Sequence, residues 1–181
     1  MFNVMFIKKL KKILKRKLSS PYEYAVYIGV NIGKDCFVPD KDTWSSEPYL
    51  ITIGNYCQIT SGVRIFTHGG GHVVRRTIPN FDIFGKVKIG NWVYIGNNSL
   101  IMPGVIIEDN VLVASGSVVT KSIPSGVVVA GNPARIICTV DEYLERNGPY
   151  NVGSKGLSHE EKKEFLLTVD RSKFIKKEFL K

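Results

Sequence analysis

A six-residue repeat between residues 83 and 123 limits what this chain can fold into more than any other feature. Each block opens with an aliphatic residue: Ile83, Ile89, Ile95, Ile101, Ile107, Val113 and Val119. A small or aliphatic residue follows four positions later: Val87, Val93, Ser99, Val105, Val111, Ser117 and Ile123. A period of six does not fit the α-helix, and turn residues recur in nearly every block. The repeat predicts a coil of short strands with flat faces, in which both sets of residues point inward.

The same spacing appears upstream, where it is interrupted twice. Ile53, Ile59 and Ile65 share the phase of the later blocks, whereas Val26, Ile32 and Val38 form an earlier patch. Residues 40–47 separate the two patches, and the change of phase across them indicates an insertion of odd length. Residues 66–82 lose the pattern over almost a whole coil and are glycine-rich, then basic. This composition predicts either a loose coil or an extruded loop with a function.

The net charge of +9 is concentrated at the ends of the chain. Residues 1–18 carry seven basic residues and no acid, and residues 19–157 carry equal numbers of basic and acidic residues. A nucleic-acid-binding domain would need a basic face on its folded part, so the charge distribution argues against that class. No stretch approaches the ~20 apolar residues that a membrane-spanning helix requires.

Helices are predicted at both ends of the repeat. Residues 1–18 place apolar side chains on one helical stripe opposite Lys and Arg, and Pro21 ends this helix. Such a helix fits an anionic membrane surface or, alternatively, packing against its own domain. Residues 139–147 are expected to form a short helix. Ser158 then caps a longer helix that runs to the C-terminus, with Glu161 completing a capping box.

The sequence therefore predicts three parts: a basic amphipathic helix (1–20), a repeat domain (21–137) and a C-terminal helical extension (138–181). The cysteines Cys36, Cys57 and Cys138 are odd in number and far apart, which favours reduced thiols. No cationic segment precedes the N-terminal apolar residues, so a secretory signal is not expected. The expected location is the cytoplasm, and the basic helix leaves a peripheral position at the inner face of the membrane open.

The hexads, followed by AGNPARII at 130–137, resemble the left-handed parallel β-helix acyltransferases, also called hexapeptide-repeat transferases. SSEPYLITIG at 45–54 and GVRIFTHGGG at 62–71 are similar to the polysaccharide and lipopolysaccharide O-acetyltransferase branch. The resemblance implies a β-class fold, a single-stranded left-handed parallel β-helix with N- and C-terminal helical extensions. It also implies a homotrimer with active sites between subunits, acetyl-CoA as the acyl donor, and a His as general base. No metal is expected.

Transfer of an acyl group from a thioester to a hydroxyl needs a base that removes the hydroxyl proton, and imidazole suits this role at neutral pH. His68 and His72 flank three glycines. Because Ile65 opens a block, residue 68 points out of the coil. His68 is predicted as the base and His72 is the second candidate. The alternative is that both are ordinary loop histidines without a catalytic role. His159 begins the C-terminal helix and is expected at the surface.

The resemblance also implies contacts for the two substrates. Ser115 and Gly116 match the segment that lines the pantetheine arm of CoA, and Lys121 and Arg135 match basic positions that meet its phosphates. Tyr94 is expected to project outward and to line the acceptor or CoA groove. Trp44, Glu47 and Asp82 are candidates for contact with the acceptor sugar, and Glu47 is alternatively placed to orient an imidazole. Alternatively, Ser115, Gly116 and Tyr94 serve in packing, and Lys121 and Arg135 are solvated charges at the surface.

The predicted function is the transfer of an acetyl group from acetyl-CoA to a hydroxyl of a surface-polysaccharide sugar or its precursor. N-acetylation of an amino sugar or small molecule stays open, because the same base serves both reactions. A non-catalytic trimeric scaffold tethered by the basic helix is a more distant alternative. A carbonic anhydrase on the same coil would need three zinc-binding histidines, and only two lie near the repeat.

Overall fold

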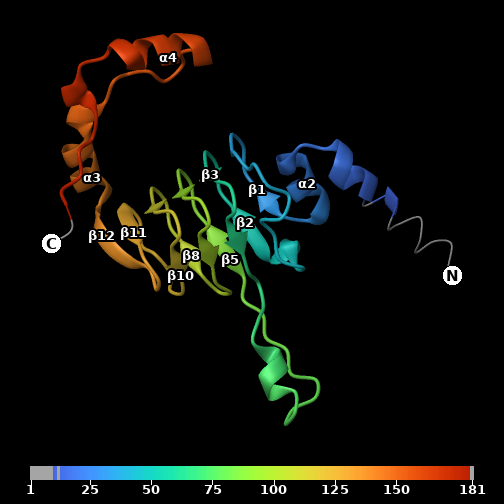
Figure 1. Ribbon diagram of the computed structural model, residues 1–181. Coiled ribbons are helices and arrows are strands. Elements are labelled where there is room, and N and C mark those ends of the chain that lie inside the picture. The colour runs from blue at the N-terminus through green and yellow to red at the C-terminus, as the bar shows by residue number, and fades with distance from the viewer. Residues whose placement is uncertain (1–9, 12, 180–181) are drawn as a thin grey trace. The chain divides into compact units, whose positions relative to one another are not determined.

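Short strands form three sheets that wrap around one core in the computed structural model, which describes residues 10–11 and 13–179 (Figure 1). One sheet has the order β1 (Asn31–Ile32), β2 (Ile51–Ile53), β5 (Val87–Ile89) and β8 (Ile106–Ile107). A second has the order β4 (Arg64–Ile65), β7 (Leu100–Ile101) and β10 (Val118–Val119). The third has the order β3 (Gln58–Ile59), β6 (Tyr94–Ile95), β9 (Leu112–Val113), β11 (Val127–Ala130) and β12 (Arg135–Thr139).

Strands of successive coils pair in parallel, as expected for a β-helix. β5 pairs with β8, β6 with β9 and β7 with β10, and paired residues such as Ile89 and Ile107 lie 18 residues apart. Three blocks of six therefore make one coil. The coil ends at β11 and β12, which pair antiparallel.

The inward positions of the repeat are confirmed for the regular coils. The residues that open the blocks from Ile89 to Val119 are buried, and so are all the residues four positions later, including Ser99 and Ser117. Both serine hydroxyls donate to the carbonyl of Ala114, at 3.1 and 2.6 Å, which satisfies these polar groups inside the core. The isoleucines and valines stack in layers because the register repeats without a shift.

Two breaks interrupt the coils. In the first coil Trp44 pairs with Ile65 and Ile32 with Ile53, both 21 residues apart, so this coil is three residues longer than a regular one. The extra residues fall between Trp44 and Ile53, where the 3-10 helix η1 (Pro48–Leu50) forms. The predicted insertion of odd length is thus confirmed, although it lies slightly later than residues 40–47.

The second break is a loop that replaces one whole turn. Ile53 pairs with Ile89 and Ile65 with Ile101, each 36 residues apart, which is two coil lengths. The chain leaves the body after Thr67 and returns at Gly85, which is the green projection of Figure 1, with the 3-10 helix η2 (Gly71–Val74) near its tip. The extruded loop is the correct alternative of the two that the sequence left open.

Two predicted inward residues are wrong. Ile83 is 51% exposed because it lies on the returning limb of the loop, and the next coil begins only at Val87. Val26 is half exposed because it lies in helix α2 (Pro21–Ile28), not in a strand. The early patch therefore starts at Ile32.

The N-terminal segment holds two helices instead of one. Residues 10–11 and 13–18 are helical, and the part of the predicted helix formed by residues 1–9 and 12 lies outside the described residues. Pro21 begins α2 rather than only ending the first helix, because proline is tolerated at the first helical position. Ser20 caps α2 and forms a capping box with Glu23, which was not among the predicted caps.

Residues 141–181 form a separate compact unit. It contains most of α3 (Val140–Asn147), then η3 (Gly148–Tyr150), α4 (His159–Thr168) and η4 (Arg171–Lys173). The capping box of Ser158 and Glu161 is confirmed. The continuous helix to the C-terminus is wrong, because α4 ends at Thr168 and Asp170 caps a new 3-10 turn.

Candidate active site

The two breaks of the coil bring Glu47 and His68 together. Nδ1 of His68 lies 2.6 Å from Oε2 of Glu47, and the hydroxyl of Thr67 donates to the same oxygen at 2.9 Å. Glu47 comes from the three-residue insertion of the first coil, and His68 comes from the first limb of the loop. Neither residue belongs to a regular block, so the regular coils serve as the frame on which this pair is mounted.

The neck of the loop fixes the position of His68. Thr67 is fully buried at the end of the coil, and its carbonyl accepts a hydrogen bond from the backbone N–H of Gly85 at 2.8 Å. His68 then forms an antiparallel bridge with Phe84 on the returning limb, with the two rings 5.8 Å apart. The imidazole is therefore held by backbone pairing below it and by an aromatic neighbour beside it.

The electrostatics of the pair favour an ionised carboxylate. Burial raises the pKa of the Glu47 carboxyl, but hydrogen bonds from Thr67, Ser46 and His68 outweigh burial and leave this pKa below its ordinary value. A carboxylate can only accept from Nδ1, so Nδ1 carries a proton and Nε2 is the ring nitrogen that is left to act as a base. Nε2 has no hydrogen-bond partner within the part of the chain that the structure describes.

His68 borders an apolar groove of ≈ 670 Å³. The groove is lined by Phe66, His68, Gly69, Gly70, Ile83, Phe84, Gly85, Met102, Pro103 and Gly104. The side chain of His68 is 40% exposed and that of Glu47 only 18%, so the imidazole is accessible while its carboxylate partner is shielded. Such a setting suits an apolar acyl chain next to a base.

The other predicted residues of the loop and the first coil lie in different surroundings. His72 is exposed in η2, and no hydrogen bond or ion pair joins it to Glu47 among the described residues. Asp82 faces Arg75 across the loop at 3.7 Å. Trp44 packs partly against the core, and its indole N–H is buried without a hydrogen-bond partner within the described residues.

The predicted CoA residues lie on the later coils. Tyr94 points outward from β6, and Ser115 and Gly116 form an exposed turn after β9. Lys121 and Arg135 line one common groove of ≈ 380 Å³. The structure thus brings the two cations together, at the C-terminal end of the coil.

Sequence reasoning missed Thr67 and Ser45 as members of the site. The hydroxyl of Ser45 lies 3.5 Å from Nδ1 of His68, on the side of the first coil. Thr67 directly precedes His68 and falls two residues after the buried Ile65. Inward and outward residues alternate along a strand. If this alternation is continued past Ile65, it predicts that Thr67 is buried, so the sequence did carry a signal for this residue.

Parallel coils of 18 residues, each made of three six-residue blocks, define a hexapeptide-repeat β-helix protein. Residues 86–121 match the family model described as bacterial transferase hexapeptide (six repeats). Protein CapG of Staphylococcus aureus is 45% identical over 162 residues, which are 86% of this chain and 91% of CapG. The putative acetyltransferase YvoF of Bacillus subtilis is 52% identical over 128 residues, or 68% of each chain.

A solved galactoside acetyltransferase in complex with coenzyme A has a TM-score of 0.52 and 25% identity, covering 77% of this chain and 82% of that one. The chain belongs to the hexapeptide-repeat acyltransferase family, as its residues 26–137 predicted. The fold implied by these relatives is the left-handed β-helix. No group of three or more His, Cys, Asp or Glu that could hold a metal ion occurs among residues 10–11 and 13–179.

No helix in the described ranges is both long enough and apolar enough to cross a bilayer.

Proposed function

We propose that this protein is an acetyl-CoA-dependent O-acetyltransferase that acts on a hydroxyl of a surface-polysaccharide sugar or its precursor. The observation that carries the proposal is the 2.6 Å contact between Glu47 and His68 beside the apolar groove. Relatives support the class of donor and acceptor, since a similar solved structure is a galactoside acetyltransferase with coenzyme A bound. A galactoside offers hydroxyls, which favours O-transfer over N-transfer.

His68 acts as general base in the proposed reaction. Its Nε2 accepts the proton of the sugar hydroxyl while that oxygen attacks the thioester carbonyl. The new C–O bond forms as the C–S bond breaks, and the imidazolium returns its proton to the departing thiolate of CoA. Glu47 stays ionised throughout the reaction. Its carboxylate accepts the hydrogen bond from Nδ1–H and stabilises the positive charge that appears on the ring.

The donor is assigned to the later coils of the same scaffold. The acetyl thioester lies in the apolar groove, and the pantetheine arm follows the small residues at Ser115 and Gly116, with Tyr94 as a wall. In this proposal Lys121 and Arg135 bind the phosphates of CoA, and the groove that they share supports this role. In a homotrimer the outer surface of a neighbouring subunit would close this path, so each active site would lie between two subunits.

The proposal includes the basic N-terminal helix as an anchor at an anionic membrane. Leu10, Leu14 and Leu18 are exposed along one side of its described part, at the spacing of a helical stripe. Apolar contact and attraction of Lys and Arg to acidic lipids act together in such helices, at about 1 kcal/mol per cation. A peripheral position suits an enzyme whose acceptor is attached to a lipid.

Replacement of His68 by Gln tests the proposed function. We expect transfer from acetyl-CoA to a sugar acceptor to fall by about 10²–10⁴-fold, because the hydroxyl loses its base. Release of CoA with galactosides and nucleotide sugars, followed through its free thiol, measures the effect. His72→Gln and His159→Gln are matched controls. Full activity in His68→Gln, or its loss in His72→Gln alone, would overturn the assignment.

A further inference from the structure

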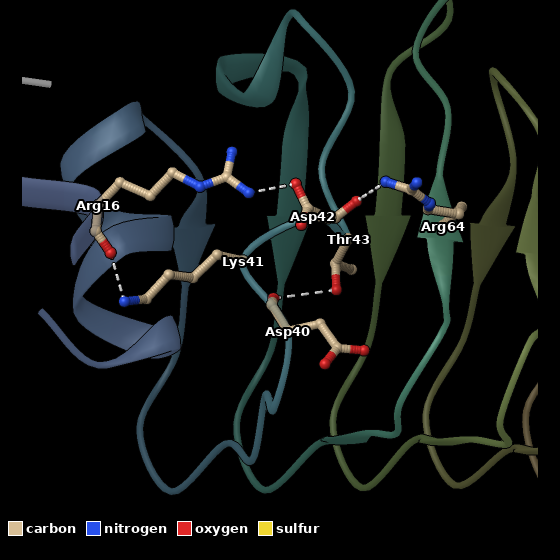
Figure 2. Close-up of polar contacts among 6 residues, drawn as sticks. All are labelled: Arg16, Asp40, Lys41, Asp42, Thr43 and Arg64. Atoms are coloured by element: carbon tan, nitrogen blue, oxygen red, sulfur yellow. Dashed lines mark hydrogen bonds and ion pairs between the residues drawn. The ribbon is translucent and has the colours of Figure 1, made fainter. Parts of the chain in front are cut away.

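Six serine and threonine residues are buried in the described part of the chain, and one of them differs from the rest in its hydrogen-bond acceptor. The hydroxyls of five donate to backbone carbonyls, namely Ser19, Thr43, Thr60, Ser99 and Ser117. Figure 2 shows one of these bonds, from Thr43 to the carbonyl of Asp40 at 3.2 Å. The hydroxyl of Thr67 donates instead to the Glu47 carboxylate. Five hydroxyls thus satisfy the interior of the coil, whereas the sixth is bonded to the candidate active site.

The bond from Thr67 meets the bond from His68 at a single oxygen. Oε2 of Glu47 lies 2.9 Å from the Thr67 hydroxyl and 2.6 Å from Nδ1 of His68. Glu47 directly precedes η1, and its flexible side chain must cross from the insertion of the first coil to the neck of the loop. A long side chain loses rotamer freedom when it is held in one orientation. A donor that is itself fixed therefore decides where Oε2 lies.

Thr67 is such a fixed donor. It is fully buried, and its backbone carbonyl accepts a hydrogen bond from the N–H of Gly85 at 2.8 Å. Gly85 in turn packs so closely on the next coil that a Cβ at this position would lie 2.2 Å from the backbone nitrogen of Gly104. Only glycine permits this approach. The Thr67 hydroxyl is thus presented to Glu47 from a point where the coil and the returning limb of the loop are locked together.

The electrostatic effect of Thr67 acts in the same direction. Burial raises the pKa of the Glu47 carboxyl, and the hydrogen bond from Thr67 is the largest of the effects that lower this pKa, ahead of those from Ser46 and His68. Thr67 does not line the apolar groove beside His68. Its influence on a reaction in that groove would therefore pass through Glu47 and His68.

We propose that Thr67 is a positioning residue of the general base, whose buried hydroxyl holds Oε2 of Glu47 in the place where it receives the Nδ1–H of His68. This role rests on the proposed function, because it is a role in the reaction of His68. Thr67 touches neither substrate, and no bond to it is made or broken. It keeps the carboxylate in the orientation that leaves Nε2 of His68 free to accept the proton of the sugar hydroxyl.

Replacement of Thr67 by Val tests this role, because valine keeps the shape of threonine and removes the donor. We expect kcat for sugar acetylation to fall about tenfold, the order expected for one hydrogen bond to a charged group. KM for acetyl-CoA should stay unchanged, since Thr67 does not line the groove. Thr67→Ser retains the hydroxyl and should recover most of kcat. Thr60→Val is the matched control, because it removes a buried hydroxyl that donates to the carbonyl of Ile95 at 2.7 Å.

Nuclear magnetic resonance reads the geometry without any reaction. The Nδ1 proton of His68 lies in a short bond to a carboxylate and should give a far-downfield signal that His68→Gln removes. This signal should move upfield or broaden in Thr67→Val and stay in place in Thr60→Val. The pKa of the Glu47 carboxyl, followed through its labelled carbon, should rise in Thr67→Val, because burial is then opposed by fewer hydrogen bonds.

An unchanged kcat and an unchanged Nδ1 signal in Thr67→Val would overturn the proposal. Equal losses of kcat in Thr67→Val and Thr60→Val, with the signal in place, would show that Thr67 is only a core residue and would contradict it too. If Thr67→Val does not fold, as its melting curve would show, Thr67→Cys decides the question, since a thiol is a weak donor of similar size. Normal kcat and a normal signal in Thr67→Cys would then reject the role.

The two kinds of measurement keep this role apart from the proposed function. If the Nδ1 signal depends on Thr67 but the wild type acetylates no sugar, the positioning of His68 stands and the proposed transferase reaction fails. If sugars are acetylated with His68 essential while Thr67→Val leaves kcat and the signal unchanged, the reaction stands and the role of Thr67 fails.

Discussion

The regular coils, residues 87–119, differ from the two breaks at residues 45–50 and 66–86 in what their side chains do. In the regular coils every marked position is buried and register repeats without a shift, so sequence is used for stability. At the breaks the register is kept by the flanking strands, and the residues between them supply Glu47 and His68. The buried positions of the regular coils thus supply stability, whereas the breaks supply the Glu47–His68 pair of the proposed reaction.

The largest expected effect is a loss of stability caused by a substitution in the interior of a regular coil. Ile95→Ala should lower the free energy of unfolding by about 2–5 kcal/mol, because Ile95 is fully buried and the layers above and below cannot close the cavity. Ile83→Ala is the matched control and should change it by at most about 0.5 kcal/mol, since Ile83 is half exposed. Denaturant titration measures both. Equal losses would show that the loop limb belongs to the core.

At the breaks we expect a substitution to reduce turnover more than it reduces stability. Glu47→Gln should reduce turnover by about tenfold to a hundredfold, because an uncharged amide neither fixes the Nδ1 proton nor stabilises an imidazolium. Steady-state kinetics with acetyl-CoA and a sugar acceptor measure the loss, and Glu145→Gln on α3 serves as the control. A variant with normal turnover would mean that Glu47 supports the loop without orienting the base.

The pH dependence of stability sharpens the same contrast. Because the pKa of Glu47 lies below its ordinary 4.5, the ionised carboxylate stabilises the folded state. This contribution is complete above about pH 4.5 and is lost as the pH falls through the lowered pKa. The difference in melting temperature between wild type and Glu47→Gln should therefore narrow between pH 6 and pH 3. If the difference in melting temperature stayed constant over this pH range, the charge of Glu47 would not contribute to stability.

The smallest expected effect concerns a thiol inside the regular coils. Burial raises the pKa of the Cys57 thiol to about 11. The folded protein then retains a proton that the unfolded chain loses near pH 9, so the stability contributed by the neutral thiol is full below pH 9 and declines up to about pH 11. Cys57→Ala should remove this part of the decline, as denaturant titrations from pH 8 to 11 would show. An identical slope in both proteins would contradict the buried, neutral thiol.

Sequence reasoning predicted most of the frame because periodicity reports burial directly. Ile89, Ile95, Ile101 and Ile107 could be placed inside the coil from spacing alone, and the phase shared with Ile53 implied that residues 66–82 could be looped out. Ile83 failed because spacing does not show where a chain leaves the coil. Pro21 failed because the same residue can end one helix and begin another.

The site was predictable in part. His68 was singled out because few histidines exist and it stands beside glycines, and Glu47 was named as a residue able to orient an imidazole. The 2.6 Å contact between them could not be derived, because it depends on three extra residues in the first coil that move Glu47 toward the neck of the loop.

The loop that stands in for a whole turn has a consequence for how such enzymes can diversify. Since Ile53 and Ile65 stack on Ile89 and Ile101 as if nothing lay between them, the stacking does not register the length or content of the excursion. Residues 69–83 could be exchanged for another segment without a change in the register of any strand or in the stacking of the core. The lining that this loop contributes to the apolar groove can then change, while the scaffold that presents His68 stays as it is.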